Sequence, residues 1–157
     1  MRTETKYTWQ DCPTAEEDKL WIRESNLIEG IDDPYEDLLS AMAWRYLKVQ
    51  KELTLDVILE THRLIMYHSK PRIAGKWRTC GVRVGSHIAP HYSMVPNLMA
   101  NWLKQYSHFK NLKGIKNAHV EFETVHPYED GNGRTGRMVM NWMRLKARYK
   151  PLCILAK

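Results

Sequence analysis

Apolar residues recur three or four positions apart along most of the chain, a spacing that predicts amphipathic helices. A first helix, over about 15–30, is expected to open at Thr14-Ala15-Glu16-Glu17, which has the residues of a capping box, and to end at Gly30. Asp33-Pro34 is a favoured N-cap and first-position pair for a second helix. Thr54 is expected to cap a third helix.

The same spacing continues toward the C-terminus. A fourth helix is expected from near Pro96, a fifth over about 116–125, and a sixth from Gly133 to about Tyr149. No repeat, low-complexity tract or Ser/Gly-rich linker divides the chain. We therefore predict an all-α fold, a helical bundle of about six helices in a single domain over 1–157.

One segment departs from helical spacing. Residues 75–91 are rich in glycine, and Val82 and Val84 alternate around Arg83 before Pro90 ends the stretch. Such alternation is typical of a β-strand, so a short β-hairpin inserted between two helices is one interpretation. An irregular surface loop fits the pattern equally well.

Composition is that of an ordinary globular protein. Of the 157 residues, 43% are hydrophobic and 27% are charged, and the length suits one hydrophobic core. No apolar run approaches the roughly 18 residues of a membrane span, and the N-terminus lacks the apolar stretch of a secretory signal. Cys12, Cys80 and Cys153 are widely spaced and form no CxxC pair, which suits a reducing compartment. We expect a cytoplasmic protein without a membrane partner.

The formal net charge of +6 attracts any polyanion but identifies no site. Most of the lysines and arginines are scattered along the predicted helices, where a solvated face explains them. Nucleic-acid binding is therefore not favoured, and the surplus fits an anionic small ligand equally well.

The residues that suggest chemistry are concentrated in 126–137. Pro127 disfavours helical geometry at the residue before it, so His126 is expected at a loop mouth where the fifth helix ends. Gly131-Asn132-Gly133 can turn successive backbone N–H groups into one concavity. Because this concavity leads into a helix, it is typical of an anion-binding site.

Two arginines strengthen the case for an anion. Arg134 and Arg137 share a face in the first turn of the sixth helix, where cations oppose the helix dipole by about 0.3–1 kcal/mol each. A polyphosphate between them would explain both. Asp130 alone would repel phosphate, but Mg²⁺ bridging its carboxylate to phosphate oxygens removes the conflict. Each residue alone fits an ordinary turn or loop, whereas their joint occurrence does not.

This segment resembles the Fic signature, HxFx(D/E)GNGRxxR, at every specified position except that Tyr128 replaces the usual phenylalanine. The resemblance extends over about 15–149 and includes Gly75-Lys76-Trp77-Arg78, similar to the start of the family's flap. It implies a Fic-type helical bundle in which 75–91 forms a β-hairpin flap and 126–149 forms the active-site loop and helix. The aromatic ring of Tyr128 would anchor the loop in the core.

The resemblance also implies an activity, the transfer of AMP from ATP to a hydroxyl side chain of a target protein. His126 would be the general base, and Asp130 would hold Mg²⁺ against the α- and β-phosphates. The protein substrate would bind along the flap by strand addition. The nucleotide-binding residues that it implies are Gly131, Asn132, Gly133, Arg134, Arg137 and Asn141.

These residues would have different roles. The amides of 131–133 would form an anion hole, Arg134 would bind the β-phosphate, and Arg137 would bind the γ-phosphate. Asn141, one turn beyond Arg137, would contact the base. Gly133 stands where the related Doc-type kinases carry lysine, which favours nucleotidyl transfer over phosphorylation.

Ser25-Asn26-Leu27-Ile28-Glu29-Gly30 resembles the family's inhibitory motif, (S/T)xxxE(G/N), placed here before the core. Ser25 and Glu29 share a helical face, and Glu29 would sit at a helix C-terminus, where an acid is disfavoured. Pairing Glu29 with Arg137 would relieve both and withdraw Arg137 from the γ-phosphate. The residues alone favour a surface glutamate before a C-cap glycine, and the resemblance favours autoinhibition.

Other functions stay open. The same site could remove AMP from a modified protein, with Glu29 positioning water, or could use another nucleotide. Outside the enzymes, the alternative is a non-catalytic nucleotide- or DNA-binding helical protein. The histidines form no HExxH motif, so a metalloprotein is not favoured. The target, its modified residue and a homo-oligomer leave no trace in the sequence.

Overall fold

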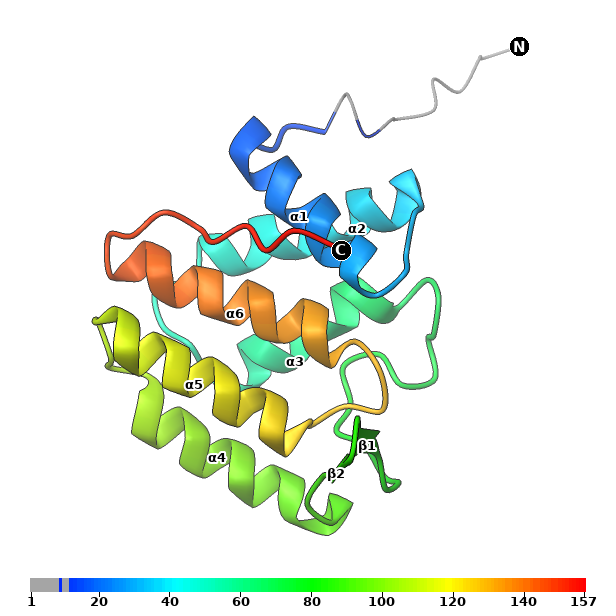
Figure 1. The fold of residues 1–157 in the computed structure, drawn as a ribbon, viewed down its shortest axis with the longest axis vertical. Coiled ribbons are helices and arrows are strands. Elements are labelled where there is room, and N and C mark those ends of the chain that lie inside the picture. Colours follow the sequence, from blue (N-terminus) through cyan, green and yellow to red (C-terminus); the bar gives the residue numbers. More distant parts are fainter. Residues whose placement is uncertain (1–8, 10–11) are drawn as a thin grey trace.

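Six α-helices and one short hairpin make up the part of the chain that the structure, a computed structural model, describes: Trp9 and residues 12–157 (Figure 1). The elements are α1 (Glu16–Ile28), α2 (Pro34–Lys48), α3 (Leu55–Met66), β1 (Arg83–Val84), β2 (His87–Ile88), a 3₁₀ turn η2 (Tyr92–Met94), α4 (Val95–Tyr106), α5 (Leu112–Val125) and α6 (Asn132–Lys146). The prediction of an all-α fold with a β-hairpin is confirmed.

Helix α6 is the centre of the bundle. It packs against α1, α2, α3 and α5, while α4 lies on the far side of α5 (Figure 1). Met138, Val139 and Trp142 are buried along α6, and the largest side chains beneath it include Trp44 and Phe122. Burial of these side chains stabilises the bundle by about 1.5–3 kcal/mol for each large apolar group. The loop between α5 and α6 therefore leads into a helix that other helices enclose on several sides.

Local capping explains where several helices begin. The Asp33 side chain accepts a hydrogen bond from Tyr35 N–H, and Thr54 accepts one from Val57 N–H, so both predicted caps are confirmed. The capping box at Thr14 was wrong, because Ala15 is the N-cap of α1 and makes no side-chain cap. The Thr14 hydroxyl instead lies 3.2 Å from the Cys12 thiol.

Two helix boundaries differ from the prediction. Helix α5 begins at Leu112, four residues before the expected start near 116, because the Asn111 side chain accepts from Gly114 N–H and caps it there. Helix α6 ends at Lys146 rather than near Tyr149. Arg148 adopts φ 66°, so the chain turns away from the helix axis.

The hairpin at 83–88 follows a long loop after α3. Arg83 pairs with Ile88 and Val84 with His87 in antiparallel register, and Gly85 at the turn has φ 59°. Such a φ is readily adopted only by glycine, which explains Gly85 at the tip. Ile88 is 68% exposed, so the hairpin stands out from the bundle (Figure 1).

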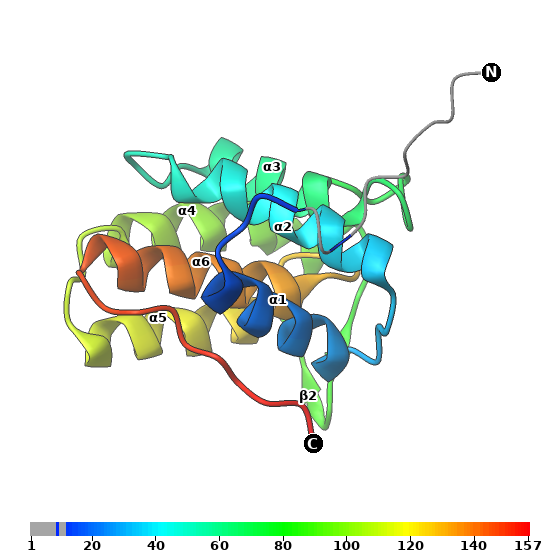
Figure 2. The ribbon, with the colours of Figure 1, turned by 90° about the horizontal axis from the view of Figure 1, so that it is seen from above.

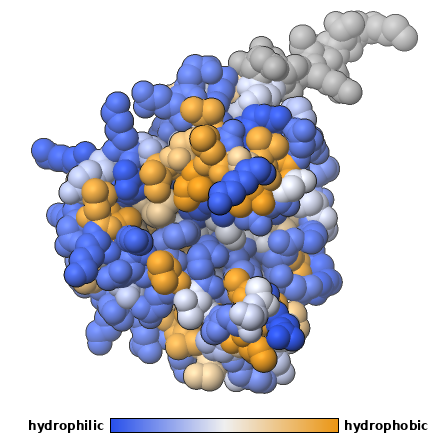
Figure 3. Space-filling model, in the orientation of Figure 1, coloured by the Kyte–Doolittle hydropathy of each residue, from blue (hydrophilic) through white to orange (hydrophobic). Residues whose placement is uncertain are grey.

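Beyond α6, the C-terminal segment runs back across the bundle to α1 without further helix (Figures 1 and 2). Ala156 N–H donates to Glu24 on α1 at 2.8 Å. The face seen in Figure 3 is mostly hydrophilic, with apolar side chains in separate patches. Among the described residues, no helix combines the length and the apolar character that a bilayer span requires.

Candidate functional site

The loop between α5 and α6 begins at His126, which lies in the left-handed region with φ 49° and ψ 65°. Pro127 disfavours the helical conformation at this position, so the expected break in the helix is confirmed. His126 N–H still bonds to Phe122 C=O at 3.0 Å, so the residue is the C-cap of α5. The imidazole is thereby presented at the end of α5 rather than along its face.

Tyr128 anchors the loop in the core, as expected. It is fully buried, and its hydroxyl donates to Ile58 C=O on α3 at 3.3 Å. The Asn132 side chain closes the loop from the other end: it accepts from Tyr128 N–H and donates to Tyr128 C=O, both at 2.8 Å. The Asn132 amide is therefore structural, and only its backbone N–H remains for a ligand.

His62 on α3 joins three parts of the site. Its ring stacks on Tyr128 with centroids 3.6 Å apart. Nδ1 accepts from Gly75 N–H at 3.0 Å, so the proton lies on Nε2, which donates to Asp130 C=O at 2.9 Å. Burial lowers the pKa of His62 to about 4, and the ring stays neutral at physiological pH.

Two glycines make room at the start of α6. Gly131 is the N-cap with φ 81°, and a Cβ there would meet Met66 and His62. A Cβ on Gly133 would collide with the Glu29 carboxylate, which lies over the first turn of the helix. The first N–H groups of a helix have no partner within it, so this position favours an anion. Gly131 N–H is already used, because it donates to Asp130 Oδ1 at 2.7 Å.

Arg134 is a buried cation without adequate partners. The residue is 3% exposed, its Nη2 donates to the Met66 sulfur at 3.1 Å, and its Nη1 lies 3.6 Å from Glu36 Oε2. Nε and Nη1 have no hydrogen-bond partner among the described residues. Burial lowers the pKa of Arg134, yet a guanidinium remains charged in proteins. Each unmade hydrogen bond of a buried group costs about 1–3 kcal/mol, so the geometry favours an added anion.

Arg137 is fully engaged by α1. Its Nε donates to the Ser25 hydroxyl at 2.8 Å, and its Nη2 donates to Ser25 C=O at 3.0 Å and to Glu29 Oε1 at 2.5 Å. The contact expected between Glu29 and Arg137 is present, and Ser25 takes part in it.

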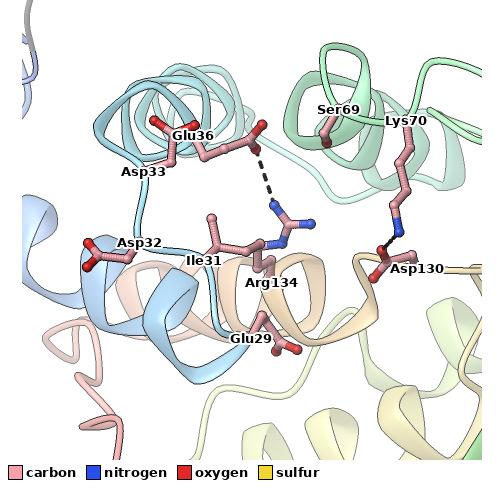
Figure 4. Close-up of a pocket in the computed structure, with 9 residues that line it drawn as sticks. All are labelled: Glu29, Ile31, Asp32, Asp33, Glu36, Ser69, Lys70, Asp130 and Arg134. Carbon is pink, nitrogen blue, oxygen red and sulfur yellow. Dashed lines mark hydrogen bonds and ion pairs between the residues drawn. The ribbon is translucent and has the colours of Figure 1, made fainter.

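Arg134 and Asp130 border a cavity of about 460 Å³ between the loop 31–33, the starts of α2 and α6, and the residues after α3 (Figure 4). Its lining residues are Glu29, Ile31, Asp32, Asp33, Glu36, Ser69, Lys70, Asp130 and Arg134. The volume is within the range of small-molecule sites. Sequence reasoning missed Glu36 and Lys70, because an acid at a helix start and a lysine after a helix are common on solvated surfaces.

Asp130 faces this cavity and pairs with Lys70 Nζ at 2.5 Å (Figure 4). Burial opposes its ionisation, but hydrogen bonds from Lys70 and Gly131 N–H outweigh burial and lower the pKa of Asp130. No group of three or more His, Cys, Asp or Glu side chains within the described residues could hold a metal ion by itself. The ionised carboxylate at the cavity wall does fit Mg²⁺ bound together with phosphate oxygens.

His126 has the character of a proton acceptor. Burial is the largest influence and lowers its pKa, whereas the nearby backbone carbonyl of Glu123 raises it. The Arg78 cation lowers this pKa further, while Glu29 and Asp130 raise it. Its Nδ1 is buried and has no hydrogen-bond partner among the described residues. A neutral imidazole of this kind can take a proton from a bound group.

Asn141 is not among the residues that line the cavity, and its expected contact with a nucleotide base stays a prediction. Its side chain is fully buried and donates to Leu152 C=O at 3.2 Å, while Leu152 N–H donates to Asn141 Oδ1 at 2.7 Å. The helical spacing from Arg137 was sound, but the C-terminal segment covers this turn of α6.

Residues 52–144 match the Fic/DOC family. The chain is 36% identical over 136 residues to "Protein adenylyltransferase Fic" of Aedes aegypti, and 37% identical over 136 residues to the protein of that name from Drosophila erecta. Each match covers 80% of this chain and 27% of the relative. The chain thus spans about a quarter of the length of these curated relatives.

Solved structures with Fic domains share the fold. A Fic domain-containing signalling protein from Bacteroides thetaiotaomicron superposes with a TM-score of 0.74 and 18% identity, over 94% of this chain and 73% of that one. Fic-1 from C. elegans gives a TM-score of 0.73 and 22% identity, over 89% of this chain and 51% of that one. Both likenesses establish the helical fold with its hairpin.

Proposed function

Because the chain belongs to the Fic/DOC family, we propose that it is a nucleotidyltransferase that moves AMP from ATP to a hydroxyl side chain of a target protein. Its curated insect relatives are named protein adenylyltransferases, although the chain spans only about a quarter of each. The observation that carries the proposal is the buried guanidinium of Arg134, left with two unsatisfied nitrogens beside a cavity.

The nucleotide phosphates would lie over the first turn of α6. There the backbone N–H groups of Asn132 and Gly133 and the positive end of the helix dipole favour negative charge. Arg134 would bind the β-phosphate and relieve its own unsatisfied donors. Arg137 would bind the γ-phosphate once it leaves Glu29. Asp130 would hold Mg²⁺, which neutralises phosphate charge when bound.

His126 would act as the general base. It accepts the proton of the target hydroxyl while the hydroxyl oxygen forms a bond to the α-phosphorus and the bond from that phosphorus to the β-phosphate oxygen breaks. Pyrophosphate leaves, and AMP stays on the target. The lowered pKa of His126 supports this role, because the neutral ring is the reactive form.

We further propose that Glu29 holds the enzyme in an inhibited state. The carboxylate lies against Gly133 and pairs with Arg137, so it competes with phosphate oxygens for the same cation and helix terminus. The protein substrate would pair by strand addition with an edge of the two-stranded hairpin 83–88. A cytoplasmic location accords with three unpaired cysteines.

The test is transfer of label from ATP carrying ³²P at the α-phosphate to acceptor proteins in the presence of Mg²⁺. We expect Glu29→Gly to raise transfer at least tenfold over the unsubstituted protein, and Glu29→Gly combined with His126→Ala to abolish it while ATP binding persists. ATP carrying ³²P at the γ-phosphate should leave no label on the acceptor.

Label from the γ-phosphate would identify a kinase instead. ATP binding without any transfer by the Glu29→Gly variant would contradict the proposed activity.

A further inference from the structure

Arg78 is a buried arginine that the proposed chemistry does not use. It lies between α3 and the hairpin and is 3% exposed. Its guanidinium donates four hydrogen bonds to backbone carbonyls of the described residues. Nε donates to His126 C=O at 2.7 Å and Nη1 to Cys80 C=O at 3.0 Å. Nη2 donates to Val125 C=O at 3.3 Å and to Pro90 C=O at 2.5 Å.

Two of these acceptors belong to the end of α5. The last carbonyls of a helix have no donor within it, so Val125 and His126 need outside partners. A cation there also complements the negative end of the helix dipole. His126 is in addition a non-glycine residue with positive φ, a conformation that persists only where surrounding contacts enforce it. Arg78 supplies such contacts directly at the His126 carbonyl.

The other two acceptors bracket the flap. Cys80 precedes β1 and Pro90 follows β2, so one side chain ties both ends of the hairpin together. The Arg78 backbone adds a third link, because its N–H donates to Pro127 C=O at 3.0 Å. The planar fork of a guanidinium can reach several carbonyls at once in fixed directions, which lysine cannot do.

We propose that Arg78 is a positioning residue that holds the backbone of His126 against both ends of the flap. One side chain thereby fixes the orientation of the general base relative to the bound target segment. This inference rests on the proposed function, since it assigns His126 the role of base and the hairpin the role of docking edge. Arg78 touches neither reacting atom and acts through the backbone of its neighbours.

The position also affects the charge state of His126. Burial is the largest influence and lowers the pKa of His126, and the backbone carbonyl of Glu123 raises it. The cation of Arg78 lowers the pKa further, whereas Glu29 and Asp130 raise it. Removing the cation therefore raises the pKa of His126, and a larger fraction of the base is protonated at a given pH. A variant that keeps the positive charge but loses the planar guanidinium separates this effect on the pKa from the effect on the position of His126.

The experiment compares Arg78→Lys and Arg78→Met, both in the Glu29→Gly background, with Arg45→Met as a control that removes one exposed arginine from α2. We expect both Arg78 variants to lower kcat for transfer by about 10–100-fold, because a displacement of about 1 Å in an active site costs up to about 10²-fold. The KM for ATP should stay within twofold. The acid limb of the kcat profile should move to higher pH in Arg78→Met and remain in place in Arg78→Lys.

An activity-independent readout accompanies the kinetics. NMR titration of the His126 ring should show a raised pKa in Arg78→Met, and amide exchange of 80–90 should accelerate in both Arg78 variants. Unchanged kcat together with an unmoved His126 titration would overturn the inference while leaving the proposed function intact. If the Glu29→Gly parent transfers no AMP, the proposed function fails, and titration and exchange still decide the inference. Should Arg78→Met not fold, Arg78→Lys decides it through kcat and exchange.

Discussion

Two buried basic side chains show how burial sets the charge and hydrogen bonding around the loop between α5 and α6. His62 is a neutral ring with both nitrogens satisfied, one by Gly75 N–H and the other by Asp130 C=O. Arg134 cannot lose its proton, and two of its nitrogens have no hydrogen-bond partner among the described residues. The first residue therefore holds the loop, and the second, although paired with Glu36 at 3.6 Å, keeps donors that an anion could use. Neither role follows from residue type alone.

The lowered pKa of His62 predicts a pH dependence of stability. The unfolded chain binds a proton on His62 near pH 6.5, but the folded chain binds it only near pH 4, so protons favour unfolding between these values. The stabilising contribution is complete above pH 6.5 and is lost as pH falls toward 4. Urea unfolding should show the parent losing about 2–3 kcal/mol more than His62→Gln between pH 7 and pH 4.

His62→Gln is a suitable comparison because glutamine can still accept from Gly75 and donate to Asp130 without titrating. If the two proteins lose the same free energy over this pH range, His62 does not titrate as its burial requires.

Helix ends decide much of the local order in this chain. Side-chain caps at Asp33, Thr54 and Asn111 start three helices, and the left-handed His126 and Gly131 end one helix and start the next. Asn132 bonds back to Tyr128 and so fixes the loop between these two residues. The anion-binding character of α6 thus depends on a loop that its own first turn holds in place.

The C-terminal segment after α6 is attached through Asn141. Asn141→Ala removes both hydrogen bonds to Leu152, so we expect the amide of Leu152 to exchange at least tenfold faster and global stability to fall by about 1–3 kcal/mol. Hydrogen exchange followed by mass spectrometry measures the first effect, and urea unfolding the second. Asn97→Ala, at an exposed position on α4, is the control.

The same variants test whether Asn141 contacts the nucleotide. ATP affinity should be unchanged in Asn141→Ala. If Asn141→Ala binds ATP more weakly while the Leu152 amide keeps its normal protection from exchange, Asn141 contacts the nucleotide after all.

The contact between Glu29 and Arg137 spans 108 positions of the chain and joins α1 to α6. Because α1 also packs on α2, the carboxylate reaches the start of α6 only when the helices are assembled. Ala156 N–H bonds to Glu24 on the same helix, so the C-terminal segment covers α1 as well. Inhibition by Glu29 would therefore depend on how firmly α1 is docked, a property of the assembled bundle.

This arrangement predicts a difference in how ATP stabilises two proteins. In Glu29→Gly, Arg137 is free for phosphate, so ATP with Mg²⁺ should raise the free energy of unfolding by about 2.7 kcal/mol at a concentration of 100 Kd. The unsubstituted protein should gain clearly less at the same ATP concentration. Thermal melts with and without ATP measure the shift, and Glu52→Gly, an exposed position outside the site, is the control. Equal shifts in both proteins would argue against competition between Glu29 and phosphate.

Residues close together in the chain were predicted well, and for a local reason. Pro127 disfavours helical geometry at His126, Gly131 permits the left-handed N-cap of α6, and Arg134 follows in the first turn of that helix. Short-range sterics and helix periodicity are therefore enough to bring these residues together. The pattern at 75–91 left a hairpin and an irregular loop equally open, and only the resemblance to the family's flap favoured the hairpin that the structure contains. These features would persist in any fold that kept the segment at a helix start.

Residues brought together from distant segments could not be predicted in this way. Three contacts join separate elements of the chain: Glu36 with Arg134, Lys70 with Asp130, and Arg78 with the ends of the flap. In the sequence these side chains look like ordinary surface charges. The contacts of Asn141 with Leu152 were hidden for the same reason, since helix periodicity gives the face of Asn141 but not the segment that covers it. The motif specified which groups can bind and react, while the packing of the helices decided which of them are buried, paired and left without a partner.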